Sequence, residues 1–457
     1  MSISNNLAKW VVDFDLLQVP DHVIEDTKFR ILDITGVMIA ARTDPMVHQV
    51  RNALLRHSVG NVTTIGSPEK VSVFEAALFN GVLSSMLEFD DSHVETGIHS
   101  SGVIISALLP QSQLIKCNGQ QLIGAMLIGA EIMARLAMVA PGYMHKNGFH
   151  PTSVFGIFGA SYALGHLLDL TREQIVNAIG LSASLSSGLM ASWQDGTSAK
   201  SMHVGFASSS AHKAVALSKV GITGPNNVFE GRFGFFPSFV QSRDTALNYS
   251  VLDMEKNKTW EVLNIASKAY PCGYVIQPCV ECALIIAQAE DFEIEQIDSI
   301  VCHIAPHAIA LVCEPVNEKV APLSSWHARV SLQFSVAEAL FYKKLDKFAY
   351  AQNVLINPSV LALANKVQYV SDPSASDRTI LKGQVDIKLK NNRFFSHTVE
   401  NMRGTVKNPS TREDFIHKFK SNTKDIYSTE KTEQMIDLIL NIENMKDISL
   451  LSDLLSA

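Results

Sequence analysis

Along residues 21–234, apolar side chains recur at every third and fourth position, which is the spacing of helices that bury one face. Start signals divide this stretch into separate helices. Pro-Asp heads residues 20–34, Ser-Pro heads residues 67–82, and residues 171–174 have the Thr-x-x-Gln form of a capping box. Few charges interrupt these segments, so the pattern predicts a packed helical bundle with enough apolar surface for a subunit interface.

The pattern changes after about residue 265. Residues 299–304 form a short run rich in β-branched side chains, and residues 385–390 lead into Asn391-Asn392, which is typical of a strand that enters a hairpin. Residues 331–345, between these two runs, have helical spacing. This part of the chain is therefore predicted to be an α+β domain.

The C-terminal tail returns to helical spacing from Thr411, with Lys and Glu on the polar face. A helical tail that follows an α+β section is expected to rejoin the first bundle. The predicted fold class is mainly α with a smaller α+β domain. Residues 1–265 form a large all-helical domain to which residues 401–457 return, and residues 266–400 form the α+β domain.

Length and composition are those of an ordered globular protein with two domains. The chain of 457 residues is too long for one compact core, and 47% of it is hydrophobic. The net charge is −7 and the Lys and Arg residues are scattered, which disfavours a nucleic-acid partner.

The sequence also gives an expectation for location. The first residues lack the basic and apolar regions of a secretory signal. The most apolar stretch, residues 122–140, is interrupted by Glu131 and Arg135, so it predicts a buried helix rather than a membrane span. We expect a cytoplasmic protein with no membrane association.

Cofactor motifs find little support in the sequence. The six cysteines have neither a disulfide-scaffold nor a zinc-finger spacing, and Cys272-x6-Cys279-x2-Cys282 is not a usual iron–sulfur spacing, so most are expected to be buried free thiols. The glycine-rich loops of dinucleotide and phosphate binding and the Gly-x-Ser-x-Gly nucleophile motif are missing from the sequence. We therefore expect chemistry that needs no cofactor.

The densest polar cluster is residues 88–102, between two apolar helical segments. Six potential acids or bases lie within twelve of these residues, and they are costly to bury unless they serve each other or a ligand. A solvated loop is the plainer alternative. Residues 90–99 could also ligate a divalent metal, but a ligand motif such as His-Glu-x-x-His is missing, so we expect no metal.

Three further segments carry candidate groups. His150 adjoins the start of an apolar helix, where a histidine tends to have a lowered pKa and exposed amides attract carboxylates. Lys200 lies among small residues with few acids nearby in the sequence, which suits a carboxylate or an oxyanion. Lys268 and Tyr270 lie where the helical pattern ends, at a domain junction. The plainer alternatives are a structural histidine, a surface lysine and a linker turn.

These segments carry motifs in a fixed order over nearly the whole chain. They are Asn80-Gly81, Phe89-Asp90-Asp91, His99-Ser100, Gly148-Phe149-His150-Pro151-Thr152, Lys200-x-x-His203-x-Gly205, Thr223-Gly224-Pro225, Phe229-Glu230-Gly231-Arg232-Phe233-Gly234-Phe235 and Lys268-Ala269-Tyr270-Pro271-Cys272. The set resembles the MmgE/PrpD family, whose members act on acids such as 2-methylcitrate, cis-aconitate and iminodisuccinate. The sequence departs from the family pattern at Glu88, where many members have Asp, at Ser100, where many have Pro, and around Gln277, where a His is often found.

The resemblance implies a homodimer whose subunits each have a large helical domain and a smaller α+β lid, with the active site between them. It makes the following residues catalytic: His99, His150, Lys200 and Lys268. It makes the following residues substrate-binding: Asp91, Ser92, His203 and Tyr270.

The predicted function is lyase chemistry, dehydration or decarboxylation, on a small di- or tricarboxylic acid. His150 or His99 would move a proton next to a carboxylate, while Lys200 and Lys268 would hold carboxylates or a developing oxyanion. Epimerisation of a dicarboxylate such as iminodisuccinate is the alternative. A noncatalytic dicarboxylate-binding homodimer is the alternative of another class, because fold does not fix function.

Overall fold

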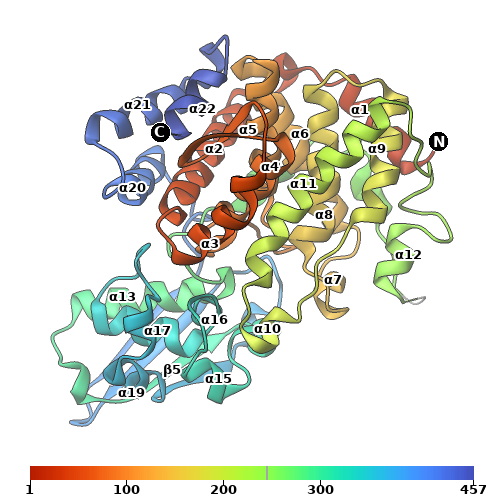
Figure 1. Cartoon of the computed structure of the whole chain (residues 1–457). Coiled ribbons are helices and arrows are strands. Elements are labelled where there is room, and N and C mark those ends of the chain that lie inside the picture. Colours follow the sequence, from red (N-terminus) through yellow and green to blue (C-terminus); the bar gives the residue numbers. More distant parts are fainter. Residues whose placement is uncertain (243–244, 457) are drawn as a thin grey trace.

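Helices from both ends of the chain pack together in the larger of two lobes (Figure 1). The structure is a computed structural model and describes residues 1–242 and 245–456. The helices of the larger lobe are α1 (Ile3–Val12), α2 (Asp21–Ala41), α3 (Pro45–Leu54), α4 (Val73–Met86), α5 (Ser100–Ile115), α6 (Gly119–Met138), α7 (Tyr143–Lys146), α8 (Pro151–Leu167), α9 (Arg172–Leu185), α10 (Ser192–Asp195), α11 (Ala199–Lys219), α12 (Phe235–Val240), α20 (Arg412–Thr423), α21 (Thr429–Leu440) and α22 (Ser449–Ser456).

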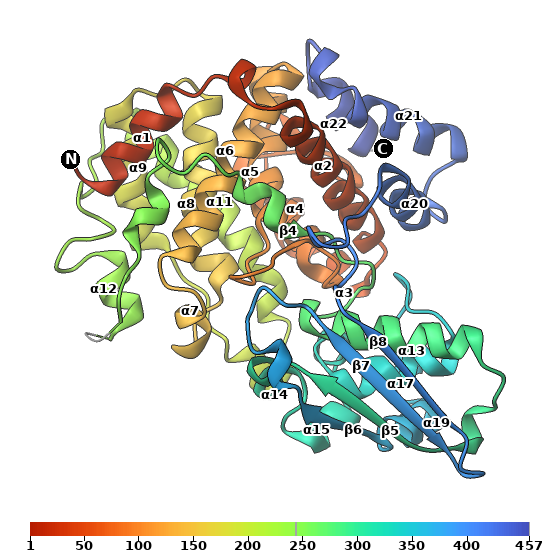
Figure 2. The ribbon, with the colours of Figure 1, turned by 180° about the vertical axis from the view of Figure 1, so that it is seen from behind.

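The smaller lobe contains a four-stranded sheet covered on one face by helices (Figure 2). The strand order is β6-β5-β7-β8, with β5 and β6 parallel and the other neighbours antiparallel. Its elements are α13 (Gln277–Ala289), β5 (Ile297–Ile304), α14 (Pro306–Val312), α15 (Val316–Val320), α16 (Ser325–Arg329), α17 (Leu332–Tyr342), α18 (Gln352–Leu355), α19 (Pro358–Ala364), β6 (Val367–Ser371), β7 (Gly383–Leu389) and β8 (Phe394–Val399). The predicted fold class, mainly α with a smaller α+β part, is confirmed.

The C-terminal helices share the hydrophobic core of the N-terminal bundle. Phe415 and Phe419 of α20 and Ile439 of α21 belong to the same buried cluster as α2, α5 and α8. Gly36 of α2 lies so close to Phe419 that a Cβ there would come within 2.9 Å of the phenylalanine ring. The C-terminal tail therefore packs over α2. The smaller lobe is inserted in the chain between two parts of the larger, helical lobe.

Several local predictions are confirmed. Thr171 forms the expected capping box with Gln174 at the start of α9, and the helix expected within residues 331–345 is α17. Helix α6 is long and apolar enough to cross a membrane by length and composition, but 89% of its apolar window is buried within the protein. It packs against α5 and α8, as expected of a core helix. The six cysteines are free and buried.

The prediction that a helix begins at Ser67 is wrong. Ser67–Val71 is strand β2, which pairs with β1 (Val62–Thr64), and the turn between them contains Gly66 with φ of +70°. Helix α4 begins only after Ser72, whose hydroxyl accepts a hydrogen bond from the Glu75 amide. A Ser-Pro pair can begin a helix or lie in a short edge strand. Here the hydrogen-bonded pairing with β1 makes it part of a strand.

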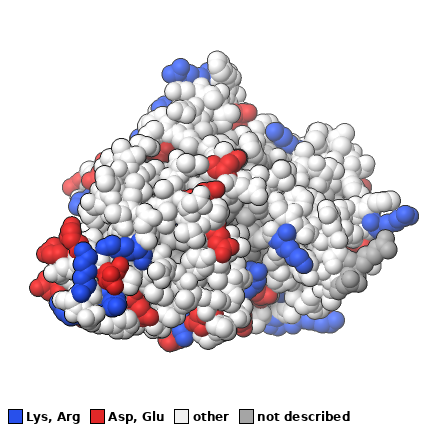
Figure 3. All heavy atoms as spheres, turned by 90° about the horizontal axis from the view of Figure 1, so that it is seen from below, with Lys and Arg blue, Asp and Glu red and all other residues white. Residues whose placement is uncertain are grey.

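Charge is spread without a block of one sign on the face seen in Figure 3. There, Lys and Arg are interspersed with Asp and Glu over the smaller lobe, and most of the remaining surface is uncharged.

Two glycines from the family-like motifs bring α4 and α11 into backbone contact. A Cβ on Gly81 would lie 2.5 Å from the Cα of Gly205, and a Cβ on Gly205 would lie 2.3 Å from the carbonyl oxygen of Leu78. The hydroxyl of Ser85 also donates to the carbonyl of Ser201 at 2.8 Å. This approach places the end of α4 beside the start of α11.

We expect Gly205→Ala to lower the free energy of unfolding by at least about 1–3 kcal/mol, because the added methyl group overlaps backbone atoms of α4 that cannot rotate away. Asn52→Ala, at an exposed position of helix α3, is the control and should change stability little. Urea denaturation of both variants measures the difference. Equal stability of the two variants would contradict the close packing.

Candidate active site

Glu88 stands at the end of α4 with its carboxylate turned toward the junction of the two lobes. Its φ of +51° is left-handed, which is uncommon for a residue other than glycine and occurs often at functional sites. The carbonyl of Leu87, just before it, accepts a hydrogen bond from Arg329 of the smaller lobe at 2.9 Å. The end of α4 is therefore fixed from both lobes.

Two lysines from distant parts of the chain bind the Glu88 carboxylate. Lys200, in the first turn of α11, donates from Nζ to one oxygen, and Lys268 donates to the other at 3.2 Å. Lys268 also donates to the Glu88 carbonyl at 3.0 Å and to Asp90 at 3.4 Å, so all three of its hydrogens are used. Two ammonium groups and two carboxylates thus form a buried cluster with no net charge.

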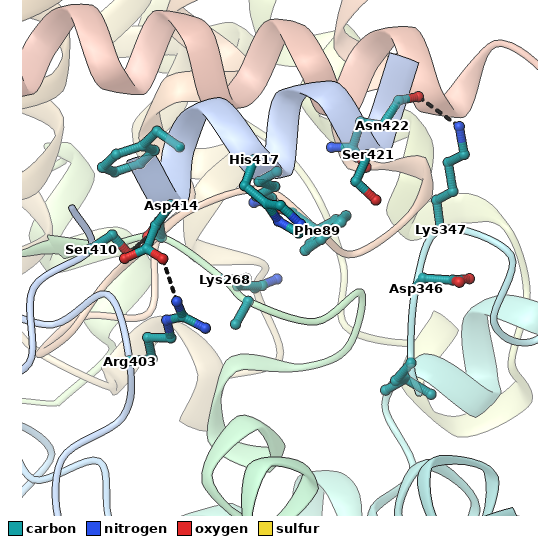
Figure 4. Close-up of a pocket in the computed structure, with 15 residues that line it drawn as sticks. Phe89, Lys268, Asp346, Lys347, Arg403, Ser410, Asp414, His417, Ser421 and Asn422 are labelled. Atoms are coloured by element: carbon teal, nitrogen blue, oxygen red, sulfur yellow. Dashed lines mark hydrogen bonds and ion pairs between the residues drawn. The ribbon is translucent and has the colours of Figure 1, made fainter. Parts of the chain in front are cut away.

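Figure 4 shows Lys268 from a neighbouring pocket of about 220 Å³, behind the cluster, where it lies near Phe89 and helix α20. Lys418 of α20 donates to the Phe89 carbonyl at 3.1 Å and lies 4.0 Å from the centre of its ring. The C-terminal tail thereby supports the segment that carries Glu88 and Asp90.

The electrostatics of the cluster favour its charged forms. Burial alone would raise the pKa of Glu88, but Lys200 and Lys268 hold it well below its ordinary value. Burial alone would lower the pKa of Lys268, but Glu88 and Asp90 raise it above its ordinary value. The carboxylate of Glu88 and the ammonium of Lys268 therefore stay ionised at neutral pH.

His99 lies beside Glu88 in an orientation fixed by its own loop. Its Nδ1 is 2.5 Å from the carbonyl oxygen of Asp91 and 2.9 Å from the hydroxyl of Ser92. Because a carbonyl can only accept, Nδ1 carries the proton, and Nε2, 3.8 Å from Glu88, is free to accept one. Burial, reinforced by Lys268 and Lys200, lowers the pKa of His99 below its ordinary value.

His150 and His203 form a second pair. His150 is the residue before α8, and its Nδ1 lies 3.1 Å from Nδ1 of His203. Burial, together with the charge of Lys200, holds the pKa of His150 well below its ordinary value and lowers that of His203 to about 4. Both rings are therefore neutral, and one Nδ1 must donate to the other.

A cavity of about 260 Å³ opens at the junction of the lobes and brings some of these groups together. Glu88, His99 and His150 line it from the larger lobe. The other lining residues are Gly97, Gly142, His145, Lys146, Met190, Trp193, Gly273, Tyr274, Val275, His307, Ala310, Leu311, Val312, Val330 and Arg378. The expected loop at residues 88–102 is buried, so the alternative of a solvated loop is wrong.

The other predicted site residues lie outside this lining set. Lys200 and Lys268 lie behind Glu88, and His203 lies behind His150. Ser92 and Asp91 hold His99, and the Asp91 carboxylate accepts from Ser101, with its pKa raised to about 6 by burial. These five residues are placed to position or polarise the groups in the cavity.

Tyr270 is placed away from the cavity. Its ring packs against the core of the smaller lobe, while Gln277 accepts from its amide at 3.1 Å and donates to its carbonyl at 2.7 Å. Gln277 stands where the family pattern often has His. Tyr274, at the start of the following 3-10 turn, supplies a phenol to the cavity instead.

Glu88, Asp90 and His99 offer ligand atoms within 4.8 Å of one another, which is close enough for a metal ion. The ammonium group of Lys268, however, is hydrogen-bonded to both carboxylates. A divalent cation would have to displace that ammonium or be repelled by it, so this donor set fits a metal poorly.

Comparison with known proteins identifies the family of the chain. The MmgE/PrpD N-terminal domain matches residues 5–248, and the MmgE/PrpD C-terminal domain matches residues 270–444. The chain belongs to the MmgE/PrpD family. It is 24% identical to the cis-aconitate decarboxylase of Aspergillus terreus, over 99% of this chain and 96% of that protein. It is 26% identical to the cis-aconitate decarboxylase of Homo sapiens, over 99% of this chain and 94% of that protein.

Sequence reasoning missed several members of this MmgE/PrpD site. The sequence marks Glu88 as a member of the polar cluster and as a departure from the family pattern, but not as the residue that both lysines bind. Tyr274, His307 and Arg378 come from the smaller lobe and belong to none of the motifs. Glu88 could have been found from its place in the polar cluster, whereas Arg378 lies in a polar loop with no distinguishing pattern.

We expect Glu88→Gln to lower the free energy of unfolding by roughly 3–5 kcal/mol, because it leaves two buried ammonium groups without their shared counter-charge. Glu433→Gln, in the half-exposed ion pair with Lys420, is the control and should have little effect. Urea denaturation at neutral pH compares the two. A loss no larger than that of the control would show that Glu88 does not neutralise the lysines.

Proposed function

We propose that the protein is a lyase that removes carbon dioxide or water from a small di- or tricarboxylic acid of the cis-aconitate type, without a cofactor. A lyase-type role is supported by full-length similarity to cis-aconitate decarboxylases. The observation that carries the proposal is the pair of neutral histidines, His99 and His150, whose ring centres lie 6.5 Å apart on one cavity at the junction of the lobes.

His99 is the proposed proton acceptor. Its Nε2 is unprotonated because Nδ1 donates to the Asp91 carbonyl, and the imidazolium that forms on accepting a proton would face the carboxylate of Glu88. The two lysines keep Glu88 ionised, so its charge is available at that moment. We also propose the predicted contact of Lys200 and Lys268 with a substrate carboxylate. To make it, the lysines would have to share between the substrate and Glu88 the ammonium hydrogens that now bind Glu88.

His150 is the proposed proton donor. If Nδ1 of His203 donates to Nδ1 of His150, then Nε2 of His150 carries a hydrogen. Giving that proton to the substrate leaves His150 as an imidazolate, which the positive charge of Lys200 would stabilise. In a decarboxylation, the electron pair left by the departing carbon dioxide would be delocalised into a remaining carboxylate until that proton arrives at carbon. In a dehydration, the same proton would go to the leaving hydroxyl.

Epimerisation remains the second candidate, because His99 and His150 come from different segments and lie on the same cavity. One ring could remove a proton from one face of a carbon acid while the other returns it to the opposite face. A noncatalytic dicarboxylate-binding protein would show neither product nor exchange.

We also propose that the protein forms a homodimer through the surface around α11. Large apolar side chains are exposed on this helix at Phe206 and Leu217 and just beyond it at Val220 and Ile222. A second copy of the chain would cover this apolar surface.

Proton NMR in deuterated water with cis-aconitate, 2-methylcitrate, citrate and iminodisuccinate tests the reaction class. We expect a new product from cis-aconitate, with deuterium incorporated at a carbon next to a remaining carboxylate. His150→Ala should lower the rate about a hundredfold or more and leave the thermal midpoint nearly unchanged, whereas exposed His57→Ala should change neither. Deuterium exchange into iminodisuccinate without lyase products would favour the epimerase. Neither product nor exchange with any of the four acids would contradict both activities.

The low pKa of the histidines predicts the pH dependence of kcat. A proton acceptor must be unprotonated, and burial with nearby lysine charge lowers the pKa of His99 below the ordinary 6.5. We therefore expect kcat to stay level as the pH falls through 6.5 and to decline only at lower pH. Lys200→Met removes one of those positive charges, so the decline should move to higher pH. A wild-type decline at the ordinary histidine pKa would contradict the assignment.

A further inference from the structure

The two walls of the cavity differ in electrostatic character. On the larger lobe, the charges of Glu88 and Asp90 are balanced by Lys200 and Lys268. This wall therefore offers little net attraction for a substrate that carries several negative charges. Attraction has to come from a cation that no carboxylate of the protein already neutralises.

Arg378, from the loop between β6 and β7 of the smaller lobe, is such a cation. It lines the cavity, and within residues 1–242 and 245–456 it makes no ion pair or hydrogen bond. Other arginines of this lobe are engaged: Arg329 donates to three backbone carbonyls, and Arg393 donates to the carbonyl of Asp291 at 3.2 Å. A guanidinium that lines the cavity and that no carboxylate of the described residues neutralises can bind an anion through its N–H donors.

The surroundings hold the Arg378 guanidinium close to His145 and His307. It lies against Gly142, which has φ of +77°, and a Cβ at that position would come within 3.0 Å of Nη2. After burial, the charge of Arg378 is the next cause that lowers the pKa of His145, to about 4, and of His307. The absence of a side chain at Gly142 thus leaves room for the guanidinium beside α7.

His307, in the first turn of α14, supplies a second unused polar group. Both of its ring nitrogens are buried, and neither has a hydrogen-bond partner among the described residues. Its ring lines the same cavity as Arg378. A neutral imidazole has one N–H, so His307 can donate one hydrogen bond to an anion that Arg378 holds.

We infer that Arg378 and His307 form a subsite for a second carboxylate of the substrate, remote from the carbon that exchanges its proton. The inference rests on the proposed function and adds to it that one carboxylate of the substrate reaches the smaller lobe. Arg378 would bind that group through both arms of its guanidinium. Because the subsite and the histidine pair lie on different lobes, a bound dicarboxylate joins them across the cavity.

Lys146 is the competing cation. It also lines the cavity, but it is exposed and lies 5.2 Å from the centre of the Tyr143 ring. A hydrated ammonium at the mouth contributes less specificity than a half-buried planar guanidinium, which favours Arg378 as the anchor.

The experiment measures binding separately from turnover. Isothermal titration with tricarballylate, a saturated tricarboxylate, and with its monoamides reports affinity for Arg378→Gln, Arg378→Lys and the control Arg393→Gln, an exposed arginine of the same lobe. We expect Arg378→Gln to weaken tricarballylate binding about 10- to 100-fold and Arg378→Lys to restore part of it. The monoamide that lacks the carboxylate bound by Arg378 should bind the wild-type protein weakly. Arg378→Gln should not weaken the binding of that monoamide further. Arg393→Gln should bind like wild type.

Equal tricarballylate affinity in wild type and Arg378→Gln would overturn the subsite, as would an equal loss for every monoamide. Thermal midpoints identify a variant that fails to fold, in which case Arg378→Lys alone is compared. The outcomes separate the two proposals. Arg378-dependent binding without turnover of any acid would keep the subsite and reject the lyase, whereas turnover with no dependence of KM on Arg378 would keep the lyase and reject the subsite.

Discussion

The shared ion pair of Glu88 with Lys200 and Lys268 joins three segments that are far apart in the chain. Removing three charges from water is costly, and their attraction offsets that cost only when all of them are in place with good geometry. The end of α4, the start of α11 and the crossover that contains Lys268 must therefore meet at one point. That requirement accounts for the glycine contact between α4 and α11, and for the tail helix α20 that packs behind Phe89.

Much of the fold could be predicted because its signals are local. The capping box at Thr171, the cap at Ser331 and the apolar stripe of the C-terminal tail each specify an element within a few residues. The helix start expected at Ser67 failed because its outcome depends on pairing with β1, which a local pattern does not contain. The capping group is Ser72, five residues later, where the hairpin ends.

The candidate site could be predicted in part, for a related reason. His99, His150, Lys200 and Lys268 stand in motifs, and the structure brings them into one network. The polar cluster makes Glu88 a candidate, but its role depends on lysines 112 and 180 residues away, so its neighbours in sequence do not reveal what it binds. Tyr274 rather than Tyr270 reaches the cavity because Gln277 holds the backbone on both sides of Tyr270. That choice is made by tertiary hydrogen bonds.

The wall of the cavity on the larger lobe carries the proton-transfer groups and has balanced charges, whereas the wall on the smaller lobe carries the cation Arg378. Proton transfer and substrate recognition are therefore assigned to different lobes. Burial and the lysine charges keep His99 and His150 neutral, while the charge of Glu88 opposes this lowering of the pKa at His99. An uncompensated cation close to those rings would attract the substrate more strongly but would depress their pKa further and weaken them as bases. Placing the anchoring charge on Arg378, in a loop of the smaller lobe, avoids that conflict. A change in that loop would then alter which acid is held while leaving the proton-transfer groups of the larger lobe in place.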